Sequence, residues 1–352
     1  MTVNTKKIFS WDTDYSADSA EFCPIENYLN FLAIGTYQLE ESNNEIDNSE
    51  ESKPTKRVGK LYLKNIENNE NPLLVQTIHT SAILDMKWCR KTINGFPILA
   101  IVTSVGETII YKLTEKDQNM QLEFCDKFTI DEALILSLDW SNSILDEECP
   151  RIVTSDSRGY INLLQVKNLH IDLLQSFKAH EFEAWISAFN YWNPNIIYTG
   201  GDDSKFRGFD LRCDPAVSTF TNKSHLSGVT SIQSNTNHEH QLANGSYDEI
   251  VNIWDTRNMK KSLKSKNLGG GIWRVKWEPY GRDLLLTACM YNGFHVINTE
   301  NELEIHASFN EHKSIAYGCD WYYKTNEDDS TVASVSFYDH LFCLWKFENK
   351  CS

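Results

Sequence analysis

Short stretches in which apolar and polar residues alternate recur at a regular interval along this chain. The two clearest copies span residues 180–212 and 225–257. Each copy opens with a histidine, continues through an alternating segment and reaches a second segment that ends in glycine. A tight turn carrying aspartate follows, and a third segment ends in Asp-Leu-Arg or Asp-Thr-Arg. Alternation with a period of two is typical of β-strands with one buried face. The pattern therefore predicts an all-β protein built from a repeated unit of short strands.

The interval between copies identifies the kind of repeat. Equivalent aspartates in the two clear copies, Asp203 and Asp248, lie 45 residues apart. More degenerate copies place their turns near positions 106, 156, 292 and 339, so successive turns are 44 to 50 residues apart. A period of ~40–45 residues with four short strands is typical of the blades of a WD-repeat propeller. The chain is therefore predicted to be a β-propeller of this kind.

The number of copies predicts a closed ring. The N-terminal section supplies a seventh copy, with strand candidates at residues 19–25, 28–37 and 57–66. We therefore expect residues 1–352 to form one domain, a seven-bladed WD-repeat β-propeller. The last copy ends after its third strand, and residues 6–11 (KKIFSW) are a strand candidate for the vacant outer place. Closure by this N-terminal strand leaves no unpaired edge on the last blade.

Charge and composition restrict the partners. The 33 Lys and Arg residues against 49 Asp and Glu residues give a net charge of −16, which disfavours nucleic acid and suits a cationic target. Part of the acidity lies in residues 40–57, which we predict to be a disordered insertion in the first blade. No apolar run approaches the ~20 residues that span a bilayer, and the N-terminus is too polar for a signal peptide. We therefore expect a cytoplasmic protein without membrane contact.

Metal and cofactor signatures are weak. The nine cysteines include no C-x-x-C pair, and His238 and His240 lie in a polar stretch that we interpret as a solvated connection. No phosphate-binding glycine loop or dinucleotide fingerprint is present. We expect neither a metal nor a cofactor.

Histidine and aspartate recur at matching positions in several copies. In a WD blade, a buried aspartate that accepts a hydrogen bond from a histidine ring, with a tryptophan farther along, ties the strands together. Candidate sets are His225 with Asp248 and Trp254, His312 with Asp339 and Trp345, and His180 with Asp203. A His–Asp pair also resembles two-thirds of a hydrolytic triad. Its recurrence in several blades favours architecture, because buried polar groups need partners.

Aromatic residues occupy positions that vary in an ordinary propeller. They lie beside the turn residue or at the start of the innermost strand: Trp185, Tyr247, Trp273, Tyr291, Tyr317 and Tyr338. Charged residues are expected close to them: Glu183, Asp202, Arg274 and Asp320. We predict that these side chains converge on one mouth of the central channel. The aromatic residues either cap the blade tops, as amphipathic rings often do, or bind a cationic group together with the carboxylates.

One WD-repeat family shares the unusual motifs of this chain. The motifs are GGDDS, GSYDE, GGGIWR, CMYNG, HKSIAYGCDW and SFYD. Between His180 and Trp345 the chain resembles the diphthine methyl ester hydrolases, the WD-repeat family of diphthamide biosynthesis. Ordinary WD repeats contain neither GGGIWR nor CMYNG, so these two motifs carry most of the resemblance.

The resemblance implies an enzymatic activity. Family members hydrolyse the methyl ester of methylated diphthine, a modified histidine of translation elongation factor 2, and release diphthine and methanol. The substrate carries a quaternary trimethylammonium next to the ester carbonyl, which suits an aromatic and acidic mouth. We therefore expect a carboxylic ester hydrolase with elongation factor 2 as its partner. The alternative is a non-catalytic scaffold that docks elongation factor 2 or another biosynthetic protein, because most propellers are platforms.

Ester hydrolysis requires a base and an oxyanion donor. We expect a water activated by His180 or Asp202, with Arg274 or the amides of residues 269–271 stabilising the oxyanion. A nucleophilic Ser246 or Ser336 is a second route, although serine is also ordinary in WD turns. Arg274 is equally expected to pair structurally with Asp320 or Glu183, because buried arginine usually finds a carboxylate.

Overall fold

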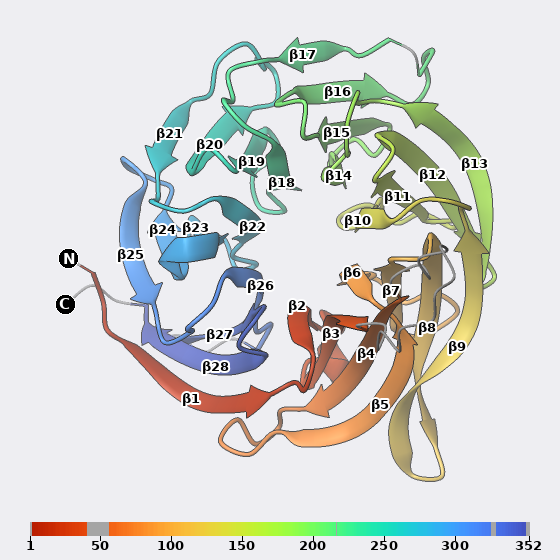
Figure 1. Ribbon diagram of the computed structural model, residues 1–352, viewed down its shortest axis with the longest axis vertical. Helices are drawn as coiled ribbons and strands as arrows, with labels where there is room; N and C mark the ends of the chain where they lie inside the picture. The colour runs from red at the N-terminus through yellow and green to blue at the C-terminus, as the bar shows by residue number, and fades with distance from the viewer. Residues whose placement is uncertain (1, 41–55, 216, 325–328, 350–352) are drawn as a thin grey trace, which may run out of the picture.

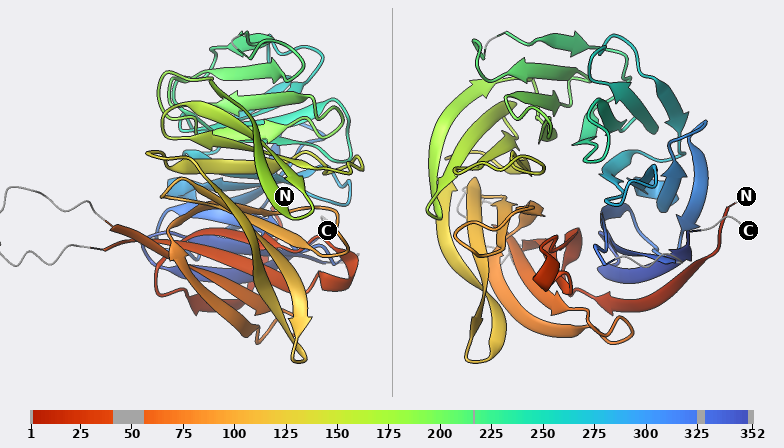
Figure 2. Two further views of the ribbon diagram at one scale, coloured as in Figure 1. Left: turned by 90° about the vertical axis from the view of Figure 1, so that its right-hand side faces the viewer. Right: turned by 180° about the vertical axis from the view of Figure 1, so that it is seen from behind.

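Seven four-stranded antiparallel sheets are arranged around a central axis in the computed structural model (Figure 1), which describes residues 2–40, 56–215, 217–324 and 329–349. Seen from the side, the sheets stack around the ring like the blades of a propeller (Figure 2). The prediction of an all-β, seven-bladed propeller is confirmed. In the described residues, no helix is long and apolar enough to cross a membrane.

Blades 1 to 6 each use four consecutive strands, from the innermost outward. Blades 1 to 3 contain β2 (Ser16–Phe22), β3 (Phe31–Glu40), β4 (Lys56–Asn65), β5 (Leu73–Ser81), β6 (Ile83–Trp88), β7 (Ile98–Thr103), β8 (Glu107–Lys116), β9 (Asn119–Thr129), β10 (Ile135–Trp140), β11 (Arg151–Asp156), β12 (Tyr160–Lys167) and β13 (His170–Lys178). Blades 4 to 6 contain β14 (Ile186–Phe189), β15 (Ile196–Gly200), β16 (Phe206–Asp210), β17 (Phe220–Asn222), β18 (Val229–Ser234), β19 (Gln241–Ser246), β20 (Ile250–Asp255), β21 (Lys264–Asn267), β22 (Ile272–Trp277), β23 (Leu284–Cys289), β24 (Phe294–Asn298) and β25 (Glu304–Phe309). Two 3-10 turns, η1 (Glu26–Tyr28) and η2 (Met290–Asn292), complete the regular structure of the described residues.

Blade 7 combines strands from the two ends of the sequence. Its inner strands are β26 (Ala316–Trp321), β27 (Asp329–Ser336) and β28 (Leu341–Glu348), and its outer strand is β1 (Thr5–Asp12). β1 runs antiparallel to β28 with Lys7 opposite Trp345, as the red and dark blue strands show in Figure 1. The N-terminal segment therefore occupies the outer place that the last repeat leaves vacant.

The predicted insertion at residues 40–57 falls mainly outside the described residues. Its two ends are described, and they belong to strands: Glu40 ends β3, and Lys56 and Arg57 begin β4. Glu40 is paired with Lys56 in the ladder. At these ends the strands therefore extend farther than the sequence predicted.

The hydrophobic core lies between neighbouring blades. Between blades 6 and 7, for example, Phe309 stacks on Trp345 with ring centroids 4.9 Å apart. Apolar residues on alternate strand positions form this packing, which is the usual consequence of a period-two pattern. Each blade is therefore held in place by its neighbours, and the loops at the ends of the strands are held in fixed positions.

The His–Asp sets tie strands together within blades, with differences from the prediction. His225 Nδ1 lies 3.2 Å from Asp248 Oδ2, and its Nε2 accepts from Asn244, which in turn accepts from the indole of Trp254. His312 does not contact Asp339 directly. Its two ring nitrogens bond to serine hydroxyls, and one of these serines bonds to Asp339 while the other accepts from Trp345.

Candidate functional site

One face of the ring carries the loops that hold the candidate residues. Because successive strands of a blade run in opposite directions, the loop entering each innermost strand and the turn between the second and third strands lie at the same end of the blade. Trp185 lies in the loop before β14, and Tyr247 follows β19 at the turn of blade 5. Trp273 and Tyr317 occupy the beginnings of the innermost strands β22 and β26.

Irregular strand pairing leaves Trp273 and Tyr317 outside the regular pairing of their strands with the neighbouring strands. In blade 6, Ile272 pairs with Cys289 and Arg274 with Ala288, so Trp273 is an extra residue on its strand. In blade 7 the register shifts in the same way between Ala316 and Cys319, on either side of Tyr317. Bulges of this kind redirect a side chain and increase the local twist.

Three rings form a compact triangle at this mouth, which we call the aromatic triad: Trp185, Tyr247 and Trp273. Their centroids are 6.0, 5.8 and 5.9 Å apart. A point above the plane of such a triangle lies within about 5 Å of all three centroids. The ring of Trp185 stands edge-on to the other two rings. Tyr317 extends the group, with its ring 4.5 Å from that of Trp273.

A carboxylate and two glycines complete the surroundings of the triad. The indole of Trp185 donates a hydrogen bond of 3.0 Å to Asp202, an exposed residue. Burial and the charge of Asp202 raise the pKa of Tyr247. A Cβ at Gly228 or Gly271 would lie 3.1 or 3.3 Å from the Tyr247 ring, so these glycines leave room for the ring. The last glycine of the GGGIWR motif thus has a packing role.

Tyr291 and Tyr338 lie on the same face but are largely exposed, at 83% and 73%. Both line a pocket of about 540 Å³ between blades 6 and 7, together with Lys313. Tyr338 is linked to the triad because the ring of Phe337 lies 5.1 Å from both Tyr338 and Tyr317. The six predicted aromatic residues therefore gather on one face, four of them in mutual contact and two at its rim.

Arg274 was predicted to lie at the mouth of the channel, but its side chain is not exposed there. Its guanidinium is buried and forms an ion pair of 3.2 Å with Asp85 in blade 2, instead of with Asp320 or Glu183. Burial opposes its charge, but Asp85 and Asp18 raise the pKa of Arg274. An arginine already satisfied by a buried carboxylate is poorly placed to stabilise charge on a ligand.

Asp320 and Glu183 were the carboxylates expected to pair with Arg274, and neither does so. Asp320 is buried in β26, accepts a hydrogen bond of 2.9 Å from the backbone N–H of Phe22, and lies 3.5 Å from Lys276. It links blades 7 and 1 and is not exposed to a ligand. Glu183 lies in the loop of Trp185, where its carbonyl accepts from the N–H of Asp202.

His180 is committed to the blade. Its Nδ1 lies 2.8 Å from Asp203, and its Nε2 lies 2.8 Å from the hydroxyl of Thr199. Burial lowers the pKa of His180, which favours the neutral ring, so Nδ1–H donates to the aspartate and Nε2 accepts from the hydroxyl. Both ring nitrogens are occupied, and the geometry is that of a structural pair.

The two candidate serines are occupied as well. Ser246 donates to the carbonyl of Ser227, and Ser336 bonds to both His312 and Asp339. Among the candidate amides, that of Gly269 donates to Asn267. These contacts are those of turns and caps.

Asp18 and Asp85 were not among the residues predicted from the sequence. Both are buried in innermost strands of the first two blades, where the repeat is degenerate, and Asp18 Oδ1 has no hydrogen-bond partner of good geometry among the described residues. Burial raises the pKa of Asp18 well above its ordinary value, against the opposing charge of Arg274. In an alignment of the chain's own repeats, Asp18 would have fallen at the level of Trp273 and Tyr317.

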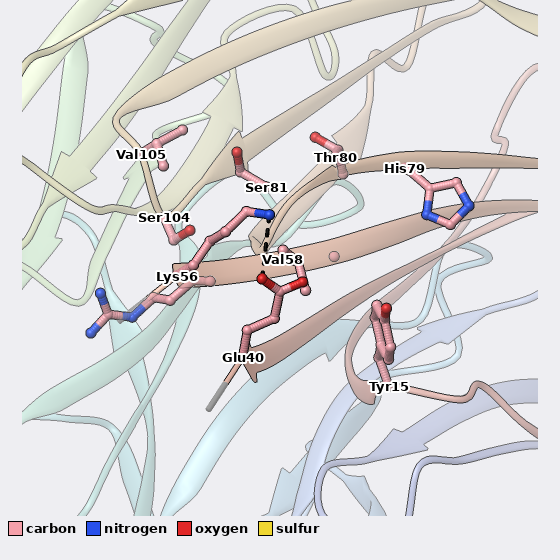
Figure 3. A pocket seen from close by; sticks show the side chains of 11 residues that line it. Tyr15, Glu40, Lys56, Val58, His79, Thr80, Ser81, Ser104 and Val105 are labelled. Atoms are coloured by element: carbon pink, nitrogen blue, oxygen red, sulfur yellow. Dashed lines mark ion pairs between the residues drawn. The ribbon is translucent and has the colours of Figure 1, made fainter. Parts of the chain in front are cut away.

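A separate pocket of about 710 Å³ lies between blades 1 and 2 (Figure 3). Its wall carries the ion pair of Lys56 and Glu40, 3.3 Å apart, with Tyr15 and His79 farther along. None of the predicted site residues lines it. In the part of the chain that the structure describes, no group of three or more metal-ligating side chains is found.

Comparisons with known proteins agree with the repeat. The model of the WD domain, G-beta repeat, matches residues 216–255. The chain is 39% identical to diphthine methyltransferase of Homo sapiens, over 94% of this chain and 77% of the relative. It is 37% identical to the diphthine methyltransferase homolog of Dictyostelium discoideum, over 94% and 96% of the two chains. In the crystal structure of a mitotic checkpoint complex, one chain matches 97% of this chain with a TM-score of 0.72 and 14% identity, which shows the fold alone.

The names of these relatives overturn one prediction. Methyl ester hydrolysis was expected from the motifs, but relatives from Homo sapiens, Mus musculus and Schizosaccharomyces pombe are named diphthine methyltransferase. A methyltransferase adds a methyl group, whereas a carboxylic ester hydrolase removes one. The predicted carboxylic ester hydrolase activity is therefore wrong by this comparison.

Proposed function

The chain belongs to the diphthine methyltransferase family of WD-repeat proteins, and we propose that it acts in the methylation of diphthine by binding the quaternary ammonium of that residue at the aromatic triad. The protein substrate in this proposal is translation elongation factor 2. The observation that carries the proposal is the triangle of Trp185, Tyr247 and Trp273, with the carboxylate of Asp202 bonded to one of its rings.

The chemistry of the triad suits this cation. A trimethylammonium cannot donate hydrogen bonds, so it is recognised by ring faces and by nearby negative charge. Asp202 is exposed and forms no ion pair within the described residues, so its charge remains available. The net charge of −16 also favours the approach of a cation over distances of about a Debye length.

A methyl donor is a separate requirement of the reaction. The common sulfonium donor carries an adenosine moiety, and an adenine nucleoside is often held at a strand–loop–helix unit. The described residues contain strands and two 3-10 turns but no α-helix. These residues do not fit such a unit, so we assign the triad to the diphthine cation and derive no step through a donor.

Binding measurements test the proposal directly. The ligands are a diphthine-bearing peptide and a matched peptide in which a neutral tert-butyl group replaces the trimethylammonium. We expect the cationic peptide to bind more tightly, because only the charged group gains from the rings and Asp202. Trp273→Ala should weaken its binding about twofold to thirtyfold, since one cation–π contact contributes ~0.5–2 kcal/mol. Trp273→Phe should restore much of this loss.

The controls separate recognition from folding. Trp273→Ala should keep the circular dichroism spectrum of the parent. With an added sulfonium donor, transfer of a labelled methyl group to the diphthine carboxylate should be slower with this variant than with the parent protein. Equal affinity for the cationic and neutral peptides, or unchanged affinity in Trp273→Ala, would refute the proposal.

A further inference from the structure

Four large apolar side chains stand exposed on the face that carries the aromatic triad. We call them the rim residues: Phe182, Leu226, Tyr291 and Tyr338. Their exposed fractions are 58%, 85%, 83% and 73%. Exposed apolar groups that gather on one face are common at protein–protein interfaces, whereas single ones scattered over a surface need no explanation.

The rim residues lie in loops and turns of blades 4 to 7, on the same face as the triad. Phe182 lies three residues before Trp185 in the same loop, and Leu226 lies in the loop that enters β18 of blade 5. The backbone N–H of Leu226 donates to Asp248, the residue after Tyr247. Tyr291 is close enough to Tyr247 to influence the pKa of that phenol. Four consecutive blades, 4 to 7, thus each supply one rim residue.

The contacts of these loops show that the rim is held in place. Asp203 and Asp248 fix the loops of Phe182 and Leu226 by accepting the N–H groups of Glu181 and Leu226. The N–H of Tyr338 donates to Ser314 in the loop that enters the innermost strand of blade 7. Side chains presented on fixed backbone lose little entropy on binding, which is typical of interface anchors.

Charge on the same loops indicates the kind of partner. Asp202 and Glu183 form no ion pair within the described residues, and Glu181 is exposed with a single lysine partner, Lys205. With Lys313 in the pocket beside Tyr291 and Tyr338, these three carboxylates face two lysines, so the rim combines apolar anchors with a small excess of negative charge. A surface of this kind is complementary to an apolar and basic surface.

We propose that the rim residues form the docking surface for the folded protein that carries diphthine, which presents the modified residue on a basic loop. This inference rests on the proposed function, because it assumes that the triad holds the cation of that residue. The triad alone is too small for a specific protein complex, which buries about 1,200–2,000 Å². The rim supplies contact area around it, with tyrosines as the strongest expected anchors.

Substitutions at the rim test docking apart from cation binding. Leu226→Asp adds negative charge and removes an apolar anchor, and Tyr338→Ala removes a second anchor in another blade. The matched control is Leu73→Asp, since Leu73 is also an exposed leucine (65%) but lies on the outermost strand of blade 1. The ligands are the intact diphthine-bearing elongation factor and the short diphthine peptide.

The two ligands should respond differently. Leu226→Asp and Tyr338→Ala should each weaken binding of the intact factor about tenfold or more, while binding of the short peptide changes less than about twofold. Leu73→Asp should change neither. Unchanged binding of the factor in both rim variants would overturn the docking surface and leave the proposed function standing.

Other outcomes are also decisive. If Trp273→Ala leaves both ligands unaffected, the proposed function fails and the inference fails with it. If light scattering shows that Leu226→Asp converts a dimer of the parent into a monomer, the rim is an interface between two copies of this chain and the docking proposal is overturned. Thermal unfolding within about 3 °C of the parent confirms that each variant is folded.

Discussion

The positive charge of Arg274 lowers the pKa of two buried carboxyl groups, those of Asp85 and Asp18, but Arg274 forms an ion pair with Asp85 alone among the described residues. Asp85 takes the ion pair, and the charges of Arg274 and Lys87 hold the pKa of Asp85 below its ordinary value despite burial. Asp18 is buried nearby with one oxygen that lacks a partner of good geometry. Its neighbour Ser19 also lowers the Asp18 pKa, but less than burial raises it. An ionised Asp18 is therefore poorly compensated in the folded state.

Because of this cost, the change in unfolding free energy caused by substituting Asp18 should depend on pH. Burial raises the pKa of Asp18, so the native state retains this proton at pH values where the unfolded chain has lost it. The stability that the group contributes is complete below the unfolded pKa of about 3.9 and is lost as pH rises through the folded pKa. We expect Asp18→Asn to be more stable than the parent by about 1–2 kcal/mol at pH 8 and similar at pH 4.

Urea unfolding at several pH values measures this difference. Asp85→Asn is the matched control, because it removes a paired carboxylate and should lower stability at neutral pH. A variant Asp18→Asn that is less stable than the parent at pH 8 would show that the ionised carboxylate is well compensated.

Single residues differ in how far the sequence predicts them. The aromatic residues could be placed on one face because each falls at a fixed position of a repeat with a known direction. The partner of Arg274 could not be predicted, because Asp85 lies in a degenerate copy four blades earlier in the chain. A periodic pattern fixes the level of a residue in its blade, but a contact across the channel depends on which residues the other blades place there.

At the scale of the blade, the histidine sets show the same difference between the position of a residue, which the repeat predicts, and its partner, which the repeat does not predict. In blade 5, His225 is bonded to Asp248 and to Asn244, and this arrangement links the entry loop to the second and third strands. In blade 7, serines mediate between His312 and Asp339. The repeat predicts a histidine, an aspartate and a tryptophan, while the short polar residues between them decide which atoms touch.

Removal of the imidazole should therefore affect folding and spare the mouth. His225→Ala removes the imidazole partner of the Asp248 carboxylate and of the Asn244 amide group, and we expect the free energy of unfolding to fall by ~1–3 kcal/mol. Denaturant unfolding measures this loss, and binding of the diphthine peptide per folded molecule should stay nearly unchanged. Loss of peptide binding with full stability would mean that His225 belongs to the functional site.

At the scale of the whole molecule, closure joins the two ends of the sequence. β1 covers the edge of β28 over the length of the strand, and Phe9 lies against Phe342 with ring centroids 6.4 Å apart. The sequence predicted this closure because the last copy of the repeat lacks a fourth strand. Without β1, the row of N–H and C=O groups along β28 would be exposed as an unpaired edge.

Deletion of residues 2–12 tests the contribution of this strand. We expect the melting temperature to fall by about 5 °C or more, because the ladder to β28 and the packing on Phe342 are lost, and we expect self-association through the exposed edge. Lys7→Ala is the matched control, since it removes only the surface ion pair with Glu311, which contributes ~0–1 kcal/mol. A synthetic peptide of residues 2–12 should restore both the melting temperature and the monomer, because it can pair with β28 in the same register. Calorimetry and light scattering measure the two effects, and a deletion variant that stays monomeric with an unchanged melting temperature would show that three strands suffice to close blade 7.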